Sequence, residues 1–78
     1  MDDEFRAALV AYIQYQKETN KERFSEPGAF EWFEEYMLSG ESERLGGIGK
    51  GIRVFYEMFG RYPTPQEMER PNGLKAIL

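Results

Sequence analysis

The side chains that could do chemistry in this sequence are carboxylates, lysines and hydroxyls, because it contains neither histidine nor cysteine. The commonest general base, the thiol nucleophile and the best transition-metal ligands are therefore missing. Glu31 and Glu35, four residues apart, would share one face of a helix and could hold a metal ion or a proton between them. Glutamates on an amphipathic helix are far more often a solvated surface. We therefore predict that the chain is not an enzyme and has no metal site and no cofactor.

A glycine-rich segment, residues 46–51, invites comparison with nucleotide-binding loops. A Walker loop ending at Lys50 would need glycine in place of Arg44 and serine or threonine in place of Gly51. The dinucleotide fingerprint fails as well, since Ile52 occupies the position of its third glycine. Glycines beside a helix start could still present backbone N–H groups to an anion. We interpret the segment instead as a flexible linker that runs into a helix, with glycines that also let another helix approach closely.

Apolar side chains recur at helical spacing in three blocks of the sequence. These blocks predict three main helices, at about residues 3–19, 26–39 and 48–59. Pro27 suits the first turn of the second helix, because the N–H that proline lacks has no partner there in any case. Gly40 is placed to end that helix in a left-handed conformation. The predicted fold is an all-α bundle that forms one small domain over residues 1–78.

Local cap chemistry predicts a short fourth helix at residues 64–70. Gly60 ends the third helix, Thr64 is the N-cap of the fourth, and Glu67 completes a capping box around Pro65. The string Gly-Arg-Tyr-Pro-Thr-Pro-Gln-Glu at residues 60–67 resembles the Gly-Arg-x-Pro-Thr-x-x-Glu turn between helices of sigma-factor-like helical domains. The resemblance covers these residues alone and identifies no family. The last residues predict a terminal apolar turn, formed by Leu74, Ile77 and Leu78.

Charge is divided unevenly along the chain, whose formal net charge is −4. Residues 1–43 carry eleven acidic and four basic side chains, whereas residues 44–78 carry three acidic and six basic ones. The basic half offers a nucleic-acid surface, and its predicted helices at 48–59 and 64–70 have the spacing of a helix-turn-helix unit. The cations of that alternative surface are Arg44, Lys50, Arg53 and Arg61. Against it, the would-be recognition helix has two acidic residues and one basic residue.

Aromatic side chains are abundant, with six phenylalanines, five tyrosines and one tryptophan among 78 residues. The helical stripes assign to the core Phe5, Leu9, Tyr12, Ile13, Phe30, Phe33, Met37, Ile48, Ile52, Phe55 and Phe59. Aromatic and methionine side chains are left over, a composition typical of protein-binding hot spots; they are Tyr15, Phe24, Trp32, Tyr36, Tyr56, Met58, Tyr62 and Met68. We predict that the partner-binding surface includes Trp32 and Tyr36 in the acidic half and Tyr56 and Tyr62 in the basic half.

No stretch of the sequence approaches the roughly 18–20 apolar residues of a membrane span, and acidic residues follow Met1 where a signal segment would be basic and then apolar. We therefore expect a cytoplasmic protein with no membrane contact. Small acidic proteins of this kind are common among accessory and inhibitor proteins of phages and other mobile elements. The predicted function is that of a small regulator, adaptor or inhibitor that binds another protein. Nucleic-acid binding is the alternative, and self-association is compatible with either.

Overall fold

The computed structural model describes residues 2–69, and within that range the chain forms five helices and no strand. The helices are α1 (Asp3–Thr19), α2 (Ala29–Leu38), α3 (Glu41–Arg44), α4 (Ile48–Phe59) and α5 (Pro65–Glu69). The all-α prediction is confirmed, and two of the three predicted main helices coincide with α1 and α4. The predicted terminal turn of Leu74, Ile77 and Leu78 lies outside the described residues, as does residue 70 of the predicted fourth helix.

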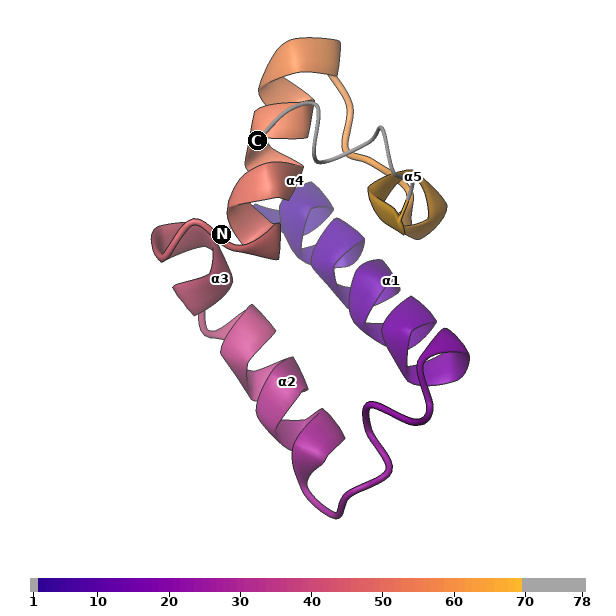
Figure 1. Ribbon diagram of the computed structural model, residues 1–78. Coiled ribbons are helices and arrows are strands. Elements are labelled where there is room, and N and C mark those ends of the chain that lie inside the picture. The colour runs from indigo at the N-terminus through magenta and orange to yellow at the C-terminus, as the bar shows by residue number, and fades with distance from the viewer. Residues whose placement is uncertain (1, 70–78) are drawn as a thin grey trace.

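Helix α1 is the central element, because α2, α4 and α5 all pack against it (Figure 1). The chain turns back after α1 so that α2 lies alongside it, and α3 then links α2 to α4. The buried side chains of α1 fall at helical spacing on one face, as expected for an amphipathic helix; they are Phe5, Leu9, Tyr12, Ile13 and Gln16. The apolar stripe read from the sequence is thus the surface on which the other helices assemble.

The hydrophobic core joins that face of α1 to side chains from three other helices, namely Phe33, Met37, Ile52 and Met68. Two predictions about the core were wrong. Phe59 is 57% exposed, because the last turn of α4 lies away from α1 (Figure 1). Met68, which we left among the exposed residues, is buried because α5 packs against α1. Phe30 and Ile48 are half-buried at the edge of the core.

Helix α2 is shorter than the predicted range of 26–39. The Ala29 amide donates to the carbonyl of Glu26 at 3.1 Å, so the residues before α2 form a turn. Gly28 then takes a left-handed conformation, with φ of +86°, as the N-cap of the helix. This conformation interrupts helical geometry and is inexpensive only for glycine. Pro27 therefore belongs to the turn, and the helix begins at Ala29.

Helix α3 lies between Gly40 and the glycine-rich segment, where we predicted no helix. Gly40 is left-handed, as predicted, with φ of +90°, but it is followed at once by this extra helical turn. The Gly47 amide donates to the carbonyl of Ser42 at 2.7 Å, which folds the chain from α3 back onto the start of α4. A Cβ atom on Gly49 would lie 2.5 Å from Ser42 Oγ and 2.9 Å from the Glu43 backbone nitrogen. Glycine at position 49 therefore allows α3 and α4 to pack in contact.

Helix α5 begins with the predicted capping box. The Thr64 amide donates to Glu67 Oε1 at 2.9 Å, and the Glu67 amide donates to Thr64 Oγ1 at 3.3 Å. The Arg61 guanidinium also donates to both carboxylate oxygens of Glu67 at 2.7 Å. The Arg61 hydrogen bonds, followed by that from the Thr64 amide, lower the pKa of Glu67 to about 2. The ionised carboxylate therefore stabilises both the turn before α5 and the first turn of the helix.

A polar contact at the other end of α5 fixes this helix against α1. Glu69 Oε1 accepts a hydrogen bond from the side-chain Nε2 of Gln16 at 2.6 Å and one from the Tyr12 hydroxyl at 3.3 Å. Burial, together with the negative charge of Glu69, raises the pKa of Tyr12 to about 12. Gln16 is itself buried, so its hydrogen bond to Glu69 offsets the cost of removing the amide from water.

Gly49→Ala should destabilise the protein, although the same change in an exposed helix normally stabilises it by about 1 kcal/mol. The added methyl group would collide with Ser42 Oγ and with the backbone of Glu43, so α3 and α4 would have to separate. We expect the free energy of unfolding in urea to fall by about 1–3 kcal/mol, the usual range for an overpacked site. Lys50→Ala, an exposed change in the same turn, should change it by less than about 0.5 kcal/mol. A more stable Gly49→Ala variant would contradict the close packing.

Glu67→Gln should reduce stability in a way that depends on pH. The folded-state pKa of about 2 lies below the ordinary value of 4.5, so the stabilisation is complete above pH 4.5 and disappears as the pH falls toward 2. Because the carboxylate lies at the surface, we expect a difference from the wild type of about 1 kcal/mol near neutral pH. The difference in urea unfolding free energy should shrink at pH 3, whereas Glu57→Gln should show no such trend. A difference that stays constant between neutral pH and pH 3 would refute the assignment.

Candidate protein-binding surface

The four aromatic residues predicted to bind a partner form two stacked pairs. Trp32 and Tyr36, one helical turn apart on α2, have ring centroids 5.4 Å apart and ring planes within 7° of parallel. Tyr56 of α4 and Tyr62 of the following loop have centroids 4.5 Å apart and an interplanar angle of 26°. The sequence predicted the members of each pair, but the pairing itself is a result of the structure.

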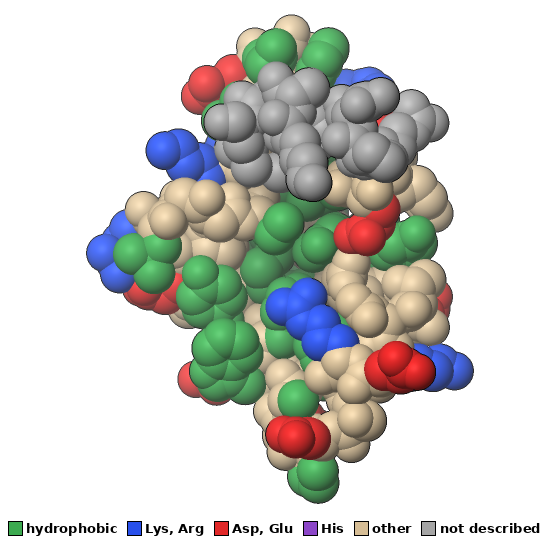
Figure 2. Space-filling view, in the orientation of Figure 1, with side chains coloured by type: hydrophobic (Ala, Val, Ile, Leu, Met, Phe, Trp, Pro, Cys, Tyr) green, Lys and Arg blue, Asp and Glu red, His purple; other side chains and the backbone are tan. Residues whose placement is uncertain are grey.

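Trp32 is the most exposed of the four rings, whereas Tyr36 is half-buried and packs against the core. Trp32 is 65% exposed, although tryptophan buries more apolar area than any other side chain when it is covered. A shallow hollow of about 250 Å³ beside the pair is lined by Trp32, Tyr36, Glu35, Ser39 and Glu41. In Figure 2, hydrophobic side chains stand out over α2 and α3 at the left of the view, with acidic groups at their edge. An apolar centre with a polar rim is the usual anatomy of a protein interface.

The Tyr56–Tyr62 pair belongs to a contact network that holds the fold together. The Tyr62 hydroxyl donates to Asp2 Oδ2 at 3.1 Å and accepts from Arg53 Nη1 at 2.9 Å. Its ring packs 5.9 Å from that of Phe5, and the side chain is half-buried. The hydroxyl of Tyr62 is thus already bonded within the chain. Tyr56, stacked on it, is 40% exposed and is the more accessible ring of the pair.

Arg53 is the centre of this network. Its Nε donates to Glu43 Oε1 at 3.0 Å and its Nη1 donates to Asp2 Oδ2 at 2.9 Å, while the guanidinium carbon lies 3.9 Å from the centroid of the Phe5 ring. Asp2 has a second role, because its Oδ1 accepts the Phe5 amide at 2.7 Å and caps α1. This backbone hydrogen bond, with help from Arg53, lowers the pKa of Asp2. A residue that we proposed for nucleic-acid contact therefore joins α1, α3 and α4.

Two of the other three candidate nucleic-acid residues are also paired with carboxylates. Arg44 Nη2 lies 2.6 Å from Glu41 Oε2, and Arg61 makes the two-point contact with Glu67. Lys50 is exposed and, among the residues that the structure describes, has no carboxylate within salt-bridge distance. At the three arginines a phosphate would have to compete with a carboxylate of the same chain, which the sequence did not reveal.

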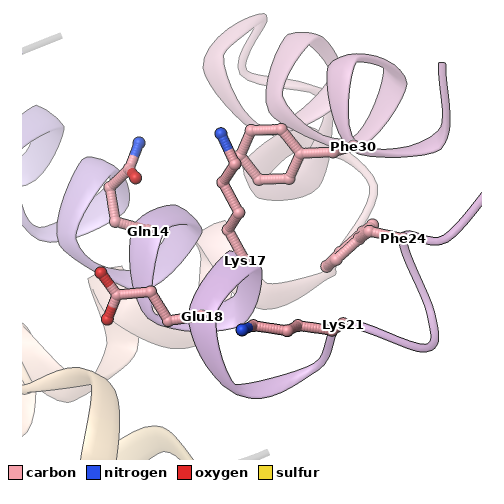
Figure 3. Close-up of a pocket in the computed structure, with 6 residues that line it drawn as sticks. All are labelled: Gln14, Lys17, Glu18, Lys21, Phe24 and Phe30. Carbon is pink, nitrogen blue, oxygen red and sulfur yellow. The ribbon is translucent and has the colours of Figure 1, made fainter. Parts of the chain in front are cut away.

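The largest of the described hollows lies elsewhere, between the end of α1 and the start of α2. Figure 3 shows Lys17 of α1 reaching toward Phe30 of α2, and its ammonium nitrogen is 4.7 Å from the ring centroid. The hollow measures about 540 Å³, and its other lining residues are Gln14, Glu18, Lys21 and Phe24. Sequence reasoning did not single out this group, because its members come from two helices and a loop. The half-buried ring of Phe24 packs on Phe30 and Phe33 there.

Comparisons with protein-family models, with curated proteins and with solved structures found no match. We therefore infer the function from the contacts, exposure and charges of the chain itself.

Neither a membrane-spanning helix nor a group of three metal-ligating side chains occurs within residues 2–69. No helix there is both long enough and apolar enough to cross a bilayer. No three carboxylates in the same range converge in a way that could hold a metal ion. Glu31 and Glu35, the pair that we considered for metal or proton sharing, lie exposed on α2.

Arg53→Lys should destabilise the protein even though it preserves the charge. Lysine cannot place separate donors on Glu43 and Asp2 while covering the Phe5 ring with a flat surface. We expect the unfolding free energy to fall by about 1.5–3 kcal/mol, the range for hydrogen bonds to charged groups. Arg44→Lys is the matched control, because the ion pair of Arg44 with Glu41 is solvent-exposed and should contribute little to stability. Equal losses in the two variants, measured by urea unfolding, would show that Arg53 has no special role in the fold.

Proposed function

We propose that this protein is a non-catalytic protein-interaction module, and that it docks its partner on the exposed Trp32–Tyr36 face of α2. The observation that carries the proposal is the 65% exposure of Trp32 in parallel contact with Tyr36. Tryptophan and tyrosine dominate the energetics of protein interfaces because they bury much area at a small cost in side-chain entropy. A small regulator or inhibitor can act through one such surface, whereas an adaptor would need a second.

The stacking supports the proposal because it prepares the rings for binding. Each ring restricts the rotation of the other, so part of the entropy cost of ordering the side chains is met before a partner arrives. The hollow beside the rings gives a partner side chain a place to enter. Tyr36 and Tyr62 are both half-buried, so the comparison depends on the other ring of each pair, and Trp32 is more exposed than Tyr56. The hydroxyl of Tyr62 is in addition already bonded to Asp2 and Arg53.

The internal ion pairs of Arg44, Arg53 and Arg61 give the nucleic-acid alternative less support than the sequence did. Affinity for nucleic acid comes largely from cations that are available to phosphates. We therefore base the proposed function on the aromatic pair.

Trp32→Ala should strongly weaken partner capture with little effect on the stability of the fold. In a pull-down from nuclease-treated lysate of the source cells, we expect the variant to lose at least about tenfold in affinity for the protein that the wild type captures, as for a hot-spot residue. Its unfolding free energy should fall by less than about 1.5 kcal/mol, the upper range for one aromatic pair. Tyr36→Ala should weaken capture in the same way.

Met58→Ala is the control for this experiment, because Met58 is 59% exposed on a different helix. It should retain the captured protein. Loss of stability with unchanged capture would mean that the Trp32–Tyr36 pair serves the fold and that docking occurs elsewhere. Capture that disappears with nuclease treatment alone would favour the nucleic-acid alternative instead.

A further inference from the structure

We propose that the Trp32–Tyr36 face recognises an arginine side chain in a basic segment of its partner, with the guanidinium stacked on the Trp32 ring and bonded to the carboxylate of Glu35. The inference rests on the proposed function of this face and adds the chemistry of the partner. It follows from the cations that lie over the other aromatic rings and from the distribution of charge around α2.

Most of the other aromatic clusters in the described part of the chain carry a cation supplied by the chain itself. Arg53 lies over Phe5 at 3.9 Å, Lys17 over Phe30 at 4.7 Å and Arg61 over Phe55 at 5.1 Å. Arg23 covers both Phe24 and Phe33, at 5.4 and 5.2 Å. Cations are drawn to the negative face of an aromatic ring, and tryptophan attracts them most strongly. Within residues 2–69, no lysine or arginine lies over Trp32, the strongest cation acceptor that the chain has. Arg23 lines a second hollow beside Trp32, but its guanidinium lies over Phe24 and Phe33.

The charge around this ring favours a cation from outside. Between Arg23 and Arg44 the sequence has six glutamates and neither lysine nor arginine. Glu35 lines the same hollow as Trp32 and Tyr36, and Glu31 precedes Glu35 by one helical turn, so both lie along one side of the aromatic pair. In the described residues neither carboxylate has a basic side chain within salt-bridge distance. Glu41, on the far side of the hollow, is already paired with Arg44.

Arginine fits this arrangement better than lysine does. Its guanidinium is flat, so it can stack on an indole ring and donate to a carboxylate in its own plane at the same time. The contact between Arg53, Phe5 and Glu43 in this protein has that geometry, with the ring below the guanidinium and the carboxylate at its edge. Trp32 and Glu35 line one hollow at the surface, with no arginine of the described residues in its lining. Tyr36 covers one face of the Trp32 ring, so the guanidinium of the partner would stack on the other face.

Trp32 is the one tryptophan in the sequence, so its fluorescence reports on this face directly. The test is a titration of the whole chain with a short peptide of alternating glycine and arginine at constant ionic strength. We expect a saturable change in Trp32 emission. A peptide with citrulline in place of arginine keeps the shape but lacks the charge, and it should bind at least about threefold more weakly. A lysine peptide should fall between the two.

Charge variants separate specific contact from general attraction to an acidic protein. The double variant Glu31→Gln with Glu35→Gln should lower the affinity for the arginine peptide by at least about threefold. Glu22→Gln with Glu57→Gln removes the same charge from two other exposed sites and should leave the affinity within about 1.5-fold. Equal losses in the two double variants, equal binding of citrulline and arginine peptides, or no saturable change would each overturn the proposal.

The captured protein distinguishes failure of this inference from failure of the proposed function. If capture requires Trp32 but is indifferent to Glu31→Gln with Glu35→Gln, the docking face stands and the arginine inference fails. If Trp32→Ala leaves capture unchanged, the docking face itself fails. Sedimentation of the wild type and of Trp32→Ala tests the remaining occupant, since a dimer that dissociates on this substitution would mean that a second copy covers the face.

Discussion

The contact of Arg53 with two carboxylates and one aromatic ring fixes the relative positions of three helices. Arg53 projects from α4, Glu43 belongs to α3, and Asp2 is the cap of α1. Hydrogen bonds to a guanidinium are directional, so satisfying both carboxylates determines the position of α4 as well as its distance from α1. The side chain is 30% exposed, which spares it the full desolvation cost of a buried ion pair.

The position of the last described helix follows from this contact. The Tyr62 hydroxyl joins Arg53 and Asp2, and so determines where the chain leaves α4. The capping box at Thr64 then directs α5 back to α1, where Met68 enters the core and Glu69 bonds to Gln16. A chain of 78 residues buries a limited core and, without cysteine, cannot add a disulfide. Directional polar contacts between the helices therefore help to fix their relative orientation, which such a small core does not do alone.

The Trp32–Tyr36 face differs from most other aromatic clusters of residues 2–69 in lacking a cation of the chain over its rings. Arginine and lysine side chains from several parts of the chain cover phenylalanine rings, of which Phe5, Phe33 and Phe55 are buried. Their charged ends lie over the rings, where they are attracted to the negative face of the aromatic system. Helix α2 contains no lysine or arginine, and its aromatic pair has acidic neighbours. In our proposal, a partner supplies at this surface the cation that the chain itself supplies to its other rings.

The sequence by itself determined the helices that local chemistry controls. Apolar periodicity located α1 and α4, and the residues around Thr64 and Glu67 located the start of α5, because caps and helical stripes act over a few neighbouring residues. The stripe of the second helix left out Trp32, which is exposed; Tyr36, which we did not assign to the core, is half-buried against it. Where local signals competed, the sequence was ambiguous: Gly28 delayed α2, and the chain between Gly40 and Gly49 formed α3.

Only the tertiary structure decided what the charged and aromatic residues of the second half do. Arg53 and Tyr62 looked available for a ligand because Asp2, their common partner, is more than fifty residues away in the chain. Met68 became a core residue and Phe59 an exposed one for the same reason, since burial depends on which helix lies opposite. A helical stripe records which side of a helix is apolar. Which residues along that stripe are covered, and which cations already have a carboxylate, depends on distances that exist only once the chain has folded.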